Sequence, residues 1–179
     1  MQKLPIYLFV VCMALLAGCS PQYKILKSNQ VDNFSLTQYK SFGFYEIEAK
    51  GDTLPERFTE NLNLIKNAIS RNLVSKGLTQ SNEPDLKINL AIVVKEKIQT
   101  RRTDFRTDAP RYIGQRRYSW KSEEIETGRY REGTLLLDFV NSSQNKLVWK
   151  GGIEGILPEK QTKFEEGINK ALQELIAPL

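Results

Sequence analysis

The sequence predicts an α+β fold, a two-layer sandwich in which a mixed or antiparallel sheet of about four to five strands carries two helices on one face. Apolar residues alternate with polar ones over residues 86–97, which is typical of a strand with one buried face. Apolar residues recur at helical spacing over 54–76 and again over 160–177. Two apolar runs flank an Asn- and Ser-rich cluster within 133–152, which indicates a central β-hairpin.

The first strand is expected over residues 40–46, where Phe42 and Phe44 alternate. These rings could line a binding face, but core packing is the stronger expectation. The strand over 86–97 follows the first predicted helix. If the two strands are parallel neighbours, the connection between them is a right-handed crossover.

In the hairpin, Leu135, Leu137 and Phe139 share one face of the first strand, and Leu147 and Trp149 are expected to share one face of the second. We expect Trp149 in the core. The alternative is a surface aromatic ring for stacking on a sugar.

The helix over 54–76 has Thr53 as a candidate N-cap and Gly77 where a left-handed C-terminal cap would lie. In the helix over 160–177, Gly167 is expected to mark a close crossing. The buried stripe of that helix comprises Phe164, Ile168, Ala171, Leu172 and Leu175.

Residues 1–18 have the layout of a signal peptide, because a positive start precedes an apolar run that is too short for a permanent membrane span. The run ends in Leu16-Ala17-Gly18-Cys19, which resembles the lipobox of bacterial lipoproteins. The resemblance implies cleavage between Gly18 and Cys19 and acylation of Cys19. The alternative is an ordinary signal peptide cut near Ala17.

Residues 19–30 are expected to be the lipidated Cys and a tether, and 31–179 a single α+β domain. The polar stretch 20–30 contains eleven residues and would reach roughly 40 Å at most. Ser20 stands where lipoproteins kept in the inner membrane often carry Asp. The resemblance therefore favours the outer membrane, with the domain facing the periplasm.

The composition argues against most enzyme classes. The chain has no His and two Cys, of which Cys12 lies in the leader. His-based triads and ordinary zinc sites are therefore excluded, and neither a metal nor a cofactor is expected. The net charge of +5 falls to +4 when the leader, with Lys3, is removed.

Residues 98–132 are the least hydrophobic part of the domain. We expect an excursion over 99–115 and then a strand over 116–126 that leads into the hairpin. The segment 95–121 carries nine basic and three acidic residues. Its arginines offer a planar fork suited to phosphate and carboxylate groups. The anion-binding candidates are Arg101, Arg102, Arg106, Arg111, Arg116 and Arg117.

Short motifs along residues 30–177 resemble bacterial lipoproteins catalogued as domain of unknown function 4136. The motifs are Phe34-Ser35, Tyr39-Lys40-Ser41-Phe42, Lys76-Gly77-Leu78, Pro84-Asp85-Leu86, Gly133-Thr134-Leu135 and Val148-Trp149-Lys150-Gly151. The resemblance implies an envelope lipoprotein with a compact α+β domain, and it supplies no catalytic residues.

Three classes of function remain. The first, which we favour, is a non-enzymatic envelope lipoprotein that is anchored in the membrane through acylated Cys19 and binds a protein partner or assists assembly. The second binds anionic lipid, lipopolysaccharide or cell-wall polymer through residues 95–121. The third is a wall-glycan enzyme using the acidic cluster Glu123, Glu124 and Glu126. Nucleic acid is excluded as a partner because the leader directs the domain out of the cytoplasm.

Overall fold

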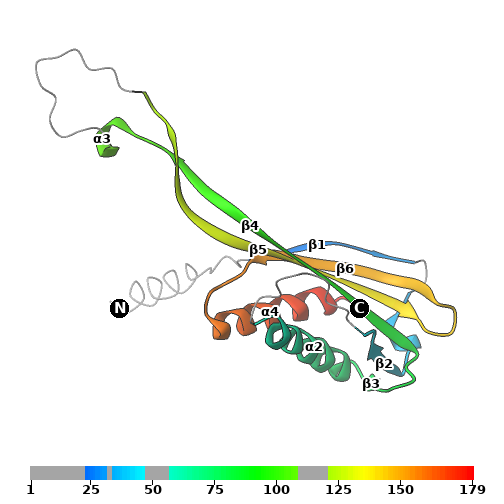
Figure 1. Ribbon diagram of the computed structural model, residues 1–179. Helices are drawn as coiled ribbons and strands as arrows, with labels where there is room; N and C mark the ends of the chain where they lie inside the picture. Colours follow the sequence, from blue (N-terminus) through cyan, green and yellow to red (C-terminus); the bar gives the residue numbers. More distant parts are fainter. Residues whose placement is uncertain (1–22, 32–33, 47–56, 109–120) are drawn as a thin grey trace, which may run out of the picture.

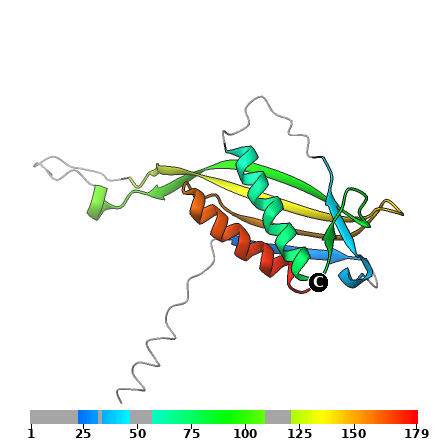
Figure 2. The same ribbon diagram turned by 90° about the horizontal axis from the view of Figure 1, so that it is seen from below.

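The computed structural model describes residues 23–31, 34–46, 57–108 and 121–179. A six-stranded sheet with the order β1-β6-β5-β4-β2-β3 forms one layer, and helices α2 and α4 cover one of its faces (Figures 1 and 2). The strands are β1 Tyr23–Gln30, β2 Ser41–Phe44, β3 Thr79–Gln80, β4 Leu86–Arg102, β5 Glu124–Asn141 and β6 Lys146–Ile156. The helices are α2 Phe58–Ser75, α3 Phe105–Asp108 and α4 Gln161–Ile176, with a 3₁₀ turn η1 at Leu36–Gln38.

The α+β class and the main connections are as predicted. β2 and β4 are parallel neighbours, with Phe42 opposite Leu86, and α2 lies between them in the sequence. β4, β5 and β6 form an antiparallel meander. The predicted number of strands was too low, because the described residues contain six, including the two-residue β3. A third helix, the four-residue α3, was not predicted either.

The second missed strand is β1, which occupies much of the predicted tether. It pairs antiparallel with β6, from Tyr23 opposite Gly155 to Gln30 opposite Trp149. A register shift between Leu26 and Asn29 breaks its apolar alternation. This irregular edge strand therefore lacks the periodic pattern by which the other strands could be recognised.

The core lies between the sheet and the two long helices. Phe42, Phe139 and Trp149 are its largest fully buried side chains, so the core position predicted for Trp149 is confirmed. The phenyl ring of Phe139 and the indole of Trp149 lie 4.6 Å apart between centroids. The predicted face of Leu147 is wrong: a bulge between Phe139 and Val140 shifts the register and leaves Leu147 44% exposed.

Helices α2 and α4 run side by side in the same direction. Near their starts Arg57 Nη1 donates to the Glu159 carbonyl at 3.0 Å, and near their ends Lys76 Nζ donates to the Ala177 carbonyl at 2.9 Å. The left-handed cap predicted at Gly77 is confirmed by its φ of 93°. The predicted cap at Thr53 lies outside the described residues.

β4 and β5 continue well past the core as a two-stranded ribbon, which is the most prominent feature of Figure 1. We call its described residues, 95–108 and 121–132, the arm. The excursion predicted over 99–115 is partly wrong, because β4 runs to Arg102 and α3 follows. Of the strand predicted over 116–126, residues 116–120 lie outside the described residues, and residues 124–126 are the beginning of β5, which continues to Asn141.

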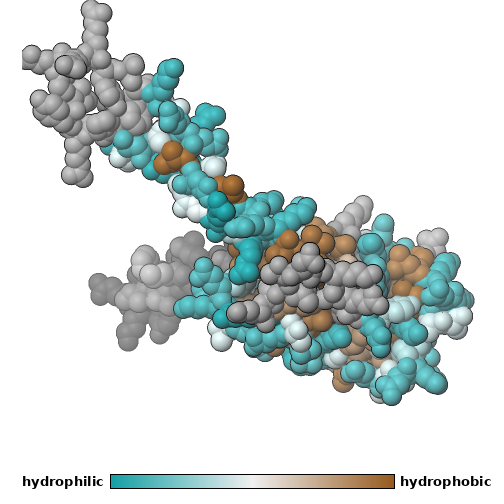
Figure 3. Space-filling model, viewed as in Figure 1, coloured by the Kyte–Doolittle hydropathy of each residue, from teal (hydrophilic) through white to brown (hydrophobic). Residues whose placement is uncertain are grey.

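Neither of the helices that cover the sheet, nor any other element of the described residues, covers the arm. Its surface is mainly hydrophilic with small hydrophobic patches (Figure 3). Cross-strand pairing continues there without a core, since the ladder runs from Lys95 opposite Glu132 to Arg102 opposite Glu124. None of the helices in the described part of the chain is long and apolar enough to span a bilayer.

Candidate functional site

The structure places three of the six predicted anion-binding residues, Arg101, Arg102 and Arg106, at the outer end of the arm and gives Arg101 a partner. The two terminal nitrogens of Arg101 donate to the two carboxylate oxygens of Asp108, at 2.7 and 2.6 Å. This pair lowers the pKa of Asp108, with further help from the backbone N–H of Asp104. Arg101 is therefore engaged within the arm and is a poorer candidate for an external anion than the sequence suggested.

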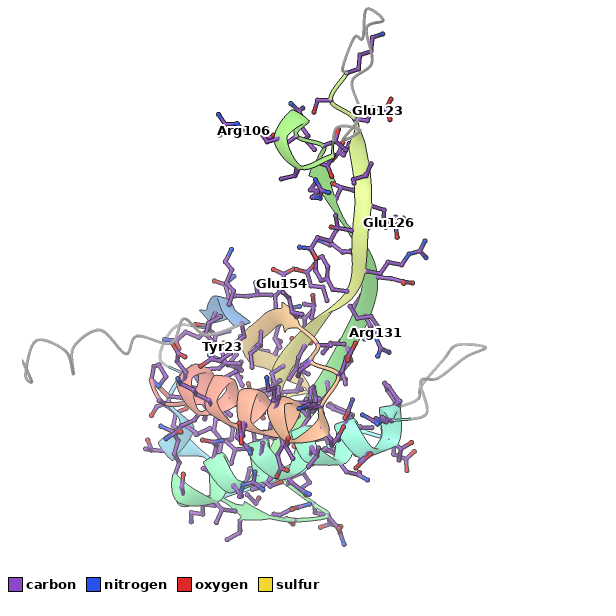
Figure 4. The ribbon with its side chains drawn as sticks, turned by 90° about the vertical axis from the view of Figure 1, so that its left-hand side faces the viewer. Tyr23, Arg106, Glu123, Glu126, Arg131 and Glu154 are labelled. Atoms are coloured by element: carbon purple, nitrogen blue, oxygen red, sulfur yellow. The ribbon has the colours of Figure 1, made fainter. Side chains whose placement is uncertain are left out.

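Arg102 and Arg106 are exposed, at the end of β4 and in α3 respectively. In Figure 4, Arg106 and Glu123 lie on opposite sides of the outer end of the arm. Arg111, Arg116 and Arg117 lie outside the described residues, as do Gly18 and Cys19 of the predicted cleavage and lipidation site.

Strand pairing brings acids to the basic segment. Glu124, Glu126 and Glu132 of β5 lie in the arm, as does Glu123 just before β5. The described residues of the arm therefore carry eight basic and seven acidic side chains. Lys97 Nζ lies 2.7 Å from Glu132 Oε2, and this hydrogen bond raises the pKa of Lys97. The described part of the arm is thus nearly neutral. Residues 95–132 as a whole carry eleven basic and seven acidic residues, so the excess of +6 over 95–121 is reduced to +4.

The acidic cluster of the enzyme hypothesis is divided among separate partners. Glu124 accepts a hydrogen bond from Thr100 Oγ1 at 2.6 Å, and Glu126 pairs with Arg129 Nε at 2.7 Å. Within the described ranges, no group of three or more His, Cys, Asp or Glu side chains could hold a metal ion. Two of the three carboxylates of the cluster, those of Glu124 and Glu126, are therefore engaged with different partners.

A different site lies at the base of the arm, where the sheet meets the first halves of α2 and α4. It is a cavity of about 590 Å³, within the usual range for small-molecule sites. Its floor is buried and apolar, formed by Ile65, Leu135, Ile153 and Ala171, each at most 5% exposed. The walls add Phe58, Leu62, Ile92, Val94, Ile156, Leu157, Phe164 and Ile168.

Polar side chains line the rest of the cavity. Arg57, Arg131 and Lys163 are exposed cationic lining residues, and Glu159 is the acidic one among the described lining residues. Tyr23 also lines it, and its hydroxyl donates to Glu174 at 2.8 Å. Burial, together with this carboxylate, raises the pKa of Tyr23 to about 12, so the phenol stays protonated at neutral pH. Figure 4 shows Tyr23 beside α4 and Arg131 at the base of the arm.

Sequence reasoning missed this cavity, although Gly167 offered a signal. The close crossing predicted at Gly167 is wrong, because a Cβ added there would meet no atom within 4 Å. Gly167 lies three residues after Phe164 and four before Ala171, on the same inner face of α4, and it lines the cavity. A glycine on the apolar stripe of a helix marks missing side-chain volume, which here is open space.

A second hollow, of about 880 Å³, lies between β2 and α2 and is polar. Its lysines are already engaged with aromatic rings, since Lys66 Nζ lies 5.6 Å from the Phe44 centroid and Lys87 Nζ lies 5.4 Å from that of Tyr45. This hollow is the weaker candidate.

Comparison with known families gives one match, a model described as "Domain of unknown function (DUF4136)", over residues 27–177. The chain belongs to this family. The match confirms the resemblance noted in the sequence and extends from within β1 nearly to the end of the chain. No curated protein is similar enough in sequence to count as a relative.

Three solved structures align with most of the chain, with TM-scores of 0.40–0.48. A PDZ domain protein from Parabacteroides distasonis aligns with 92% of the chain at 14% identity and a TM-score of 0.48, and the chain spans 39% of that protein's length. The PelC dodecamer from Paraburkholderia phytofirmans aligns with 88% of the chain and 97% of its own, at 8% identity and a TM-score of 0.46. A PelC dodecamer that carries a single substitution aligns with 87% of the chain and 92% of its own length, at 8% identity and a TM-score of 0.40.

Proposed function

We propose that this family member is a non-enzymatic envelope lipoprotein, anchored in the outer membrane through acylated Cys19, whose domain binds or helps to assemble a protein partner in the periplasm. The observation that carries the proposal is the arm. Eight residues of β4, from Lys95 to Arg102, extend roughly 26 Å past the point where the core ends.

Within the described residues, both edges of the arm are open beyond Arg131, whose carbonyl still accepts a hydrogen bond from Leu157 N–H. β2 pairs with β4 only as far as Ile88, and β6 pairs with β5 only from Glu132 onward. Unpaired strand edges are templates for the backbone of another chain. Ile98, 55% exposed, adds apolar surface to the same ribbon.

Site-specific crosslinking tests the arm. A photoreactive amino acid replaces Ile98 in the full chain, and in the matched control it replaces Val74, which is equally exposed at 55% but lies on α2. Irradiation of intact cells is expected to give a discrete protein adduct from position 98 and none from position 74. Equal adducts from both positions, or none from either, would contradict the proposal.

Shortening the arm gives a second test. Glu96 lies opposite Arg131 in the ladder, so an Asn-Gly turn can join them in place of residues 97–130. The sandwich should still fold, because its buried side chains lie elsewhere. The shortened variant is expected to fold and to lose its protein partner. If the variant bound the partner as well as the wild type does, the function would be assigned to another surface.

The anchor is tested separately with Cys19→Ala. Stable anchoring needs two or more acyl chains, and the variant removes their attachment point. Labelled palmitate should be incorporated into the wild-type chain and not into the variant. Incorporation into Cys19→Ala would refute the lipobox interpretation.

The second candidate, binding of anionic lipid, lipopolysaccharide or wall polymer, is favoured by exposed Arg102 and Arg106 and by the three further arginines in 109–120. Replacing Arg102, Arg106, Arg116 and Arg117 with Gln should abolish salt-sensitive retention on anionic vesicles or wall sacculi. Replacing Arg129, which is paired with Glu126, with Gln is the control. Absence of retention by the wild-type chain at low salt would remove this candidate.

A further inference from the structure

We propose that the cavity between the sheet and the first halves of α2 and α4 binds a single-chain amphiphile, with its acyl chain inside and an anionic head group, carboxylate or phosphate, at the mouth. This inference does not depend on the arm, and either proposal can fail without the other.

The interior suits an acyl chain. Its floor of Ile65, Leu135, Ile153 and Ala171 has no polar side chain, and burial there would remove methylene groups from water. Gly167 leaves the space that a larger residue on the helix face would fill. The opposite wall is tight, because a Cβ on Gly133 would lie 2.8 Å from Leu157 Cδ2. The space therefore opens toward α4.

The spacing between the starts of α2 and α4 is fixed by contacts within the protein. Arg57 bonds to the Glu159 carbonyl at 3.0 Å, and Gln161 Nε2 donates to Asn61 Oδ1 at 2.9 Å. These two contacts set the spacing of the helix starts. A preformed apolar space of this kind avoids the cost of rearranging the protein on binding.

The mouth suits an anion. Three cationic side chains, those of Arg57, Arg131 and Lys163, line the cavity against one acidic residue, Glu159. Both helices also begin here, because they run in the same direction, and neither has a side-chain cap. The positive dipole ends of the two helices add to the attraction for negative charge.

The test uses the full chain in nanodiscs of zwitterionic lipid and a long-chain fatty acid that carries a diazirine near the end of its chain. Adducts should map to cavity-lining peptides of α4 and the end of β6. Gly167→Phe should reduce this labelling about tenfold or more, since the ring displaces several methylene groups. Gly167→Ala adds only one methyl group and should keep labelling within about twofold.

Two lysine substitutions on α4, one inside the cavity lining and one outside it, test the binding of the head group. Lys163→Gln should weaken labelling several-fold, whereas Lys170→Gln, exposed on α4 outside the cavity, should leave it unchanged. Excess fatty acid or single-chain phospholipid should compete, and whichever competes at lower concentration identifies the carboxylate or the phosphate. Equal competition by the neutral fatty alcohol would overturn the anionic part of the proposal.

Thermal unfolding shows whether Gly167→Phe is folded, and Gly167→Leu is the substitute if it is not. The proposal would be overturned if the wild type and a folded Gly167→Phe or Gly167→Leu variant were labelled equally. The proposal would also be overturned if the Cys19→Ala variant were strongly labelled and the lipidated wild-type chain were not labelled. Tyr23 lines the cavity and lies four residues after Cys19. That result would assign the cavity to the protein's own anchor.

Discussion

The two halves of β4 have the same conformation and opposite surroundings. From Leu86 to Leu90 every second side chain is buried under the helices, whereas from Val93 to Arg102 every side chain is exposed. The alternation of apolar residues extends to Val94 and then gives way to charged residues. The comparison teaches that pairing with β5 suffices to continue a strand, and that the helices decide where the core ends.

The largest effect is expected inside the core. Trp149→Ala removes the indole that stacks against Phe139 and should lower the free energy of unfolding by roughly 3–5 kcal/mol. Denaturant unfolding measures this change. A variant with an unchanged melting temperature would contradict the role of Trp149 in the core.

A smaller effect is expected from Gly151→Ala. The added Cβ would lie 2.5 Å from Trp149 Cη2 and 3.0 Å from Leu175 Cδ1, so the core must shift to admit it. Overpacking of this kind costs about 1–3 kcal/mol. Gly167→Ala, at an open position, is the matched control and should be neutral or stabilising in the same unfolding assay.

Asp85 links the starts of β2 and β4 and makes stability depend on pH. Its Oδ2 accepts hydrogen bonds from the N–H groups of Lys40 at 3.1 Å and Ser41 at 3.2 Å. The bond from Lys40 is the main cause that lowers its pKa below 3.8. The carboxylate therefore contributes stability above its unfolded pKa and loses it as the pH falls through the lower folded pKa.

Asp85→Asn should accordingly melt at a lower temperature than wild type at pH 7. The difference should narrow below about pH 4, where the wild-type carboxylate takes up a proton. Melting curves from pH 7 to pH 2 test this. A difference that stays constant over the whole range would show that charge plays no part.

The smallest effect is expected on the arm. Ile98→Ala removes an exposed side chain from a ribbon without a core and should change the free energy of unfolding by no more than about 0.5 kcal/mol. The same assay applied to Ile88→Ala, at a fully buried position on the same strand, should show a loss of roughly 2–5 kcal/mol. Similar losses at both positions would mean that the arm is packed against something in solution.

The sequence by itself determined the α+β class, the central hairpin, both long helices, the cap at Gly77 and the burial of Trp149. Each depends on local periodicity or turn chemistry, which is written in neighbouring residues. The motif around Pro84-Asp85 was also visible, although its hydrogen bonds to Lys40 and Ser41 were not.

Only the tertiary structure decided the rest. β1 is a strand because β6 offers it an edge, and Leu147 faces solvent because a bulge shifts the register. The charge of residues 95–121 is only partly offset by acids that β5 brings alongside, and the cavity exists because two helix starts and a glycine meet over the sheet. These features arise from pairing between distant segments, and a reading of local pattern carries no information about such contacts.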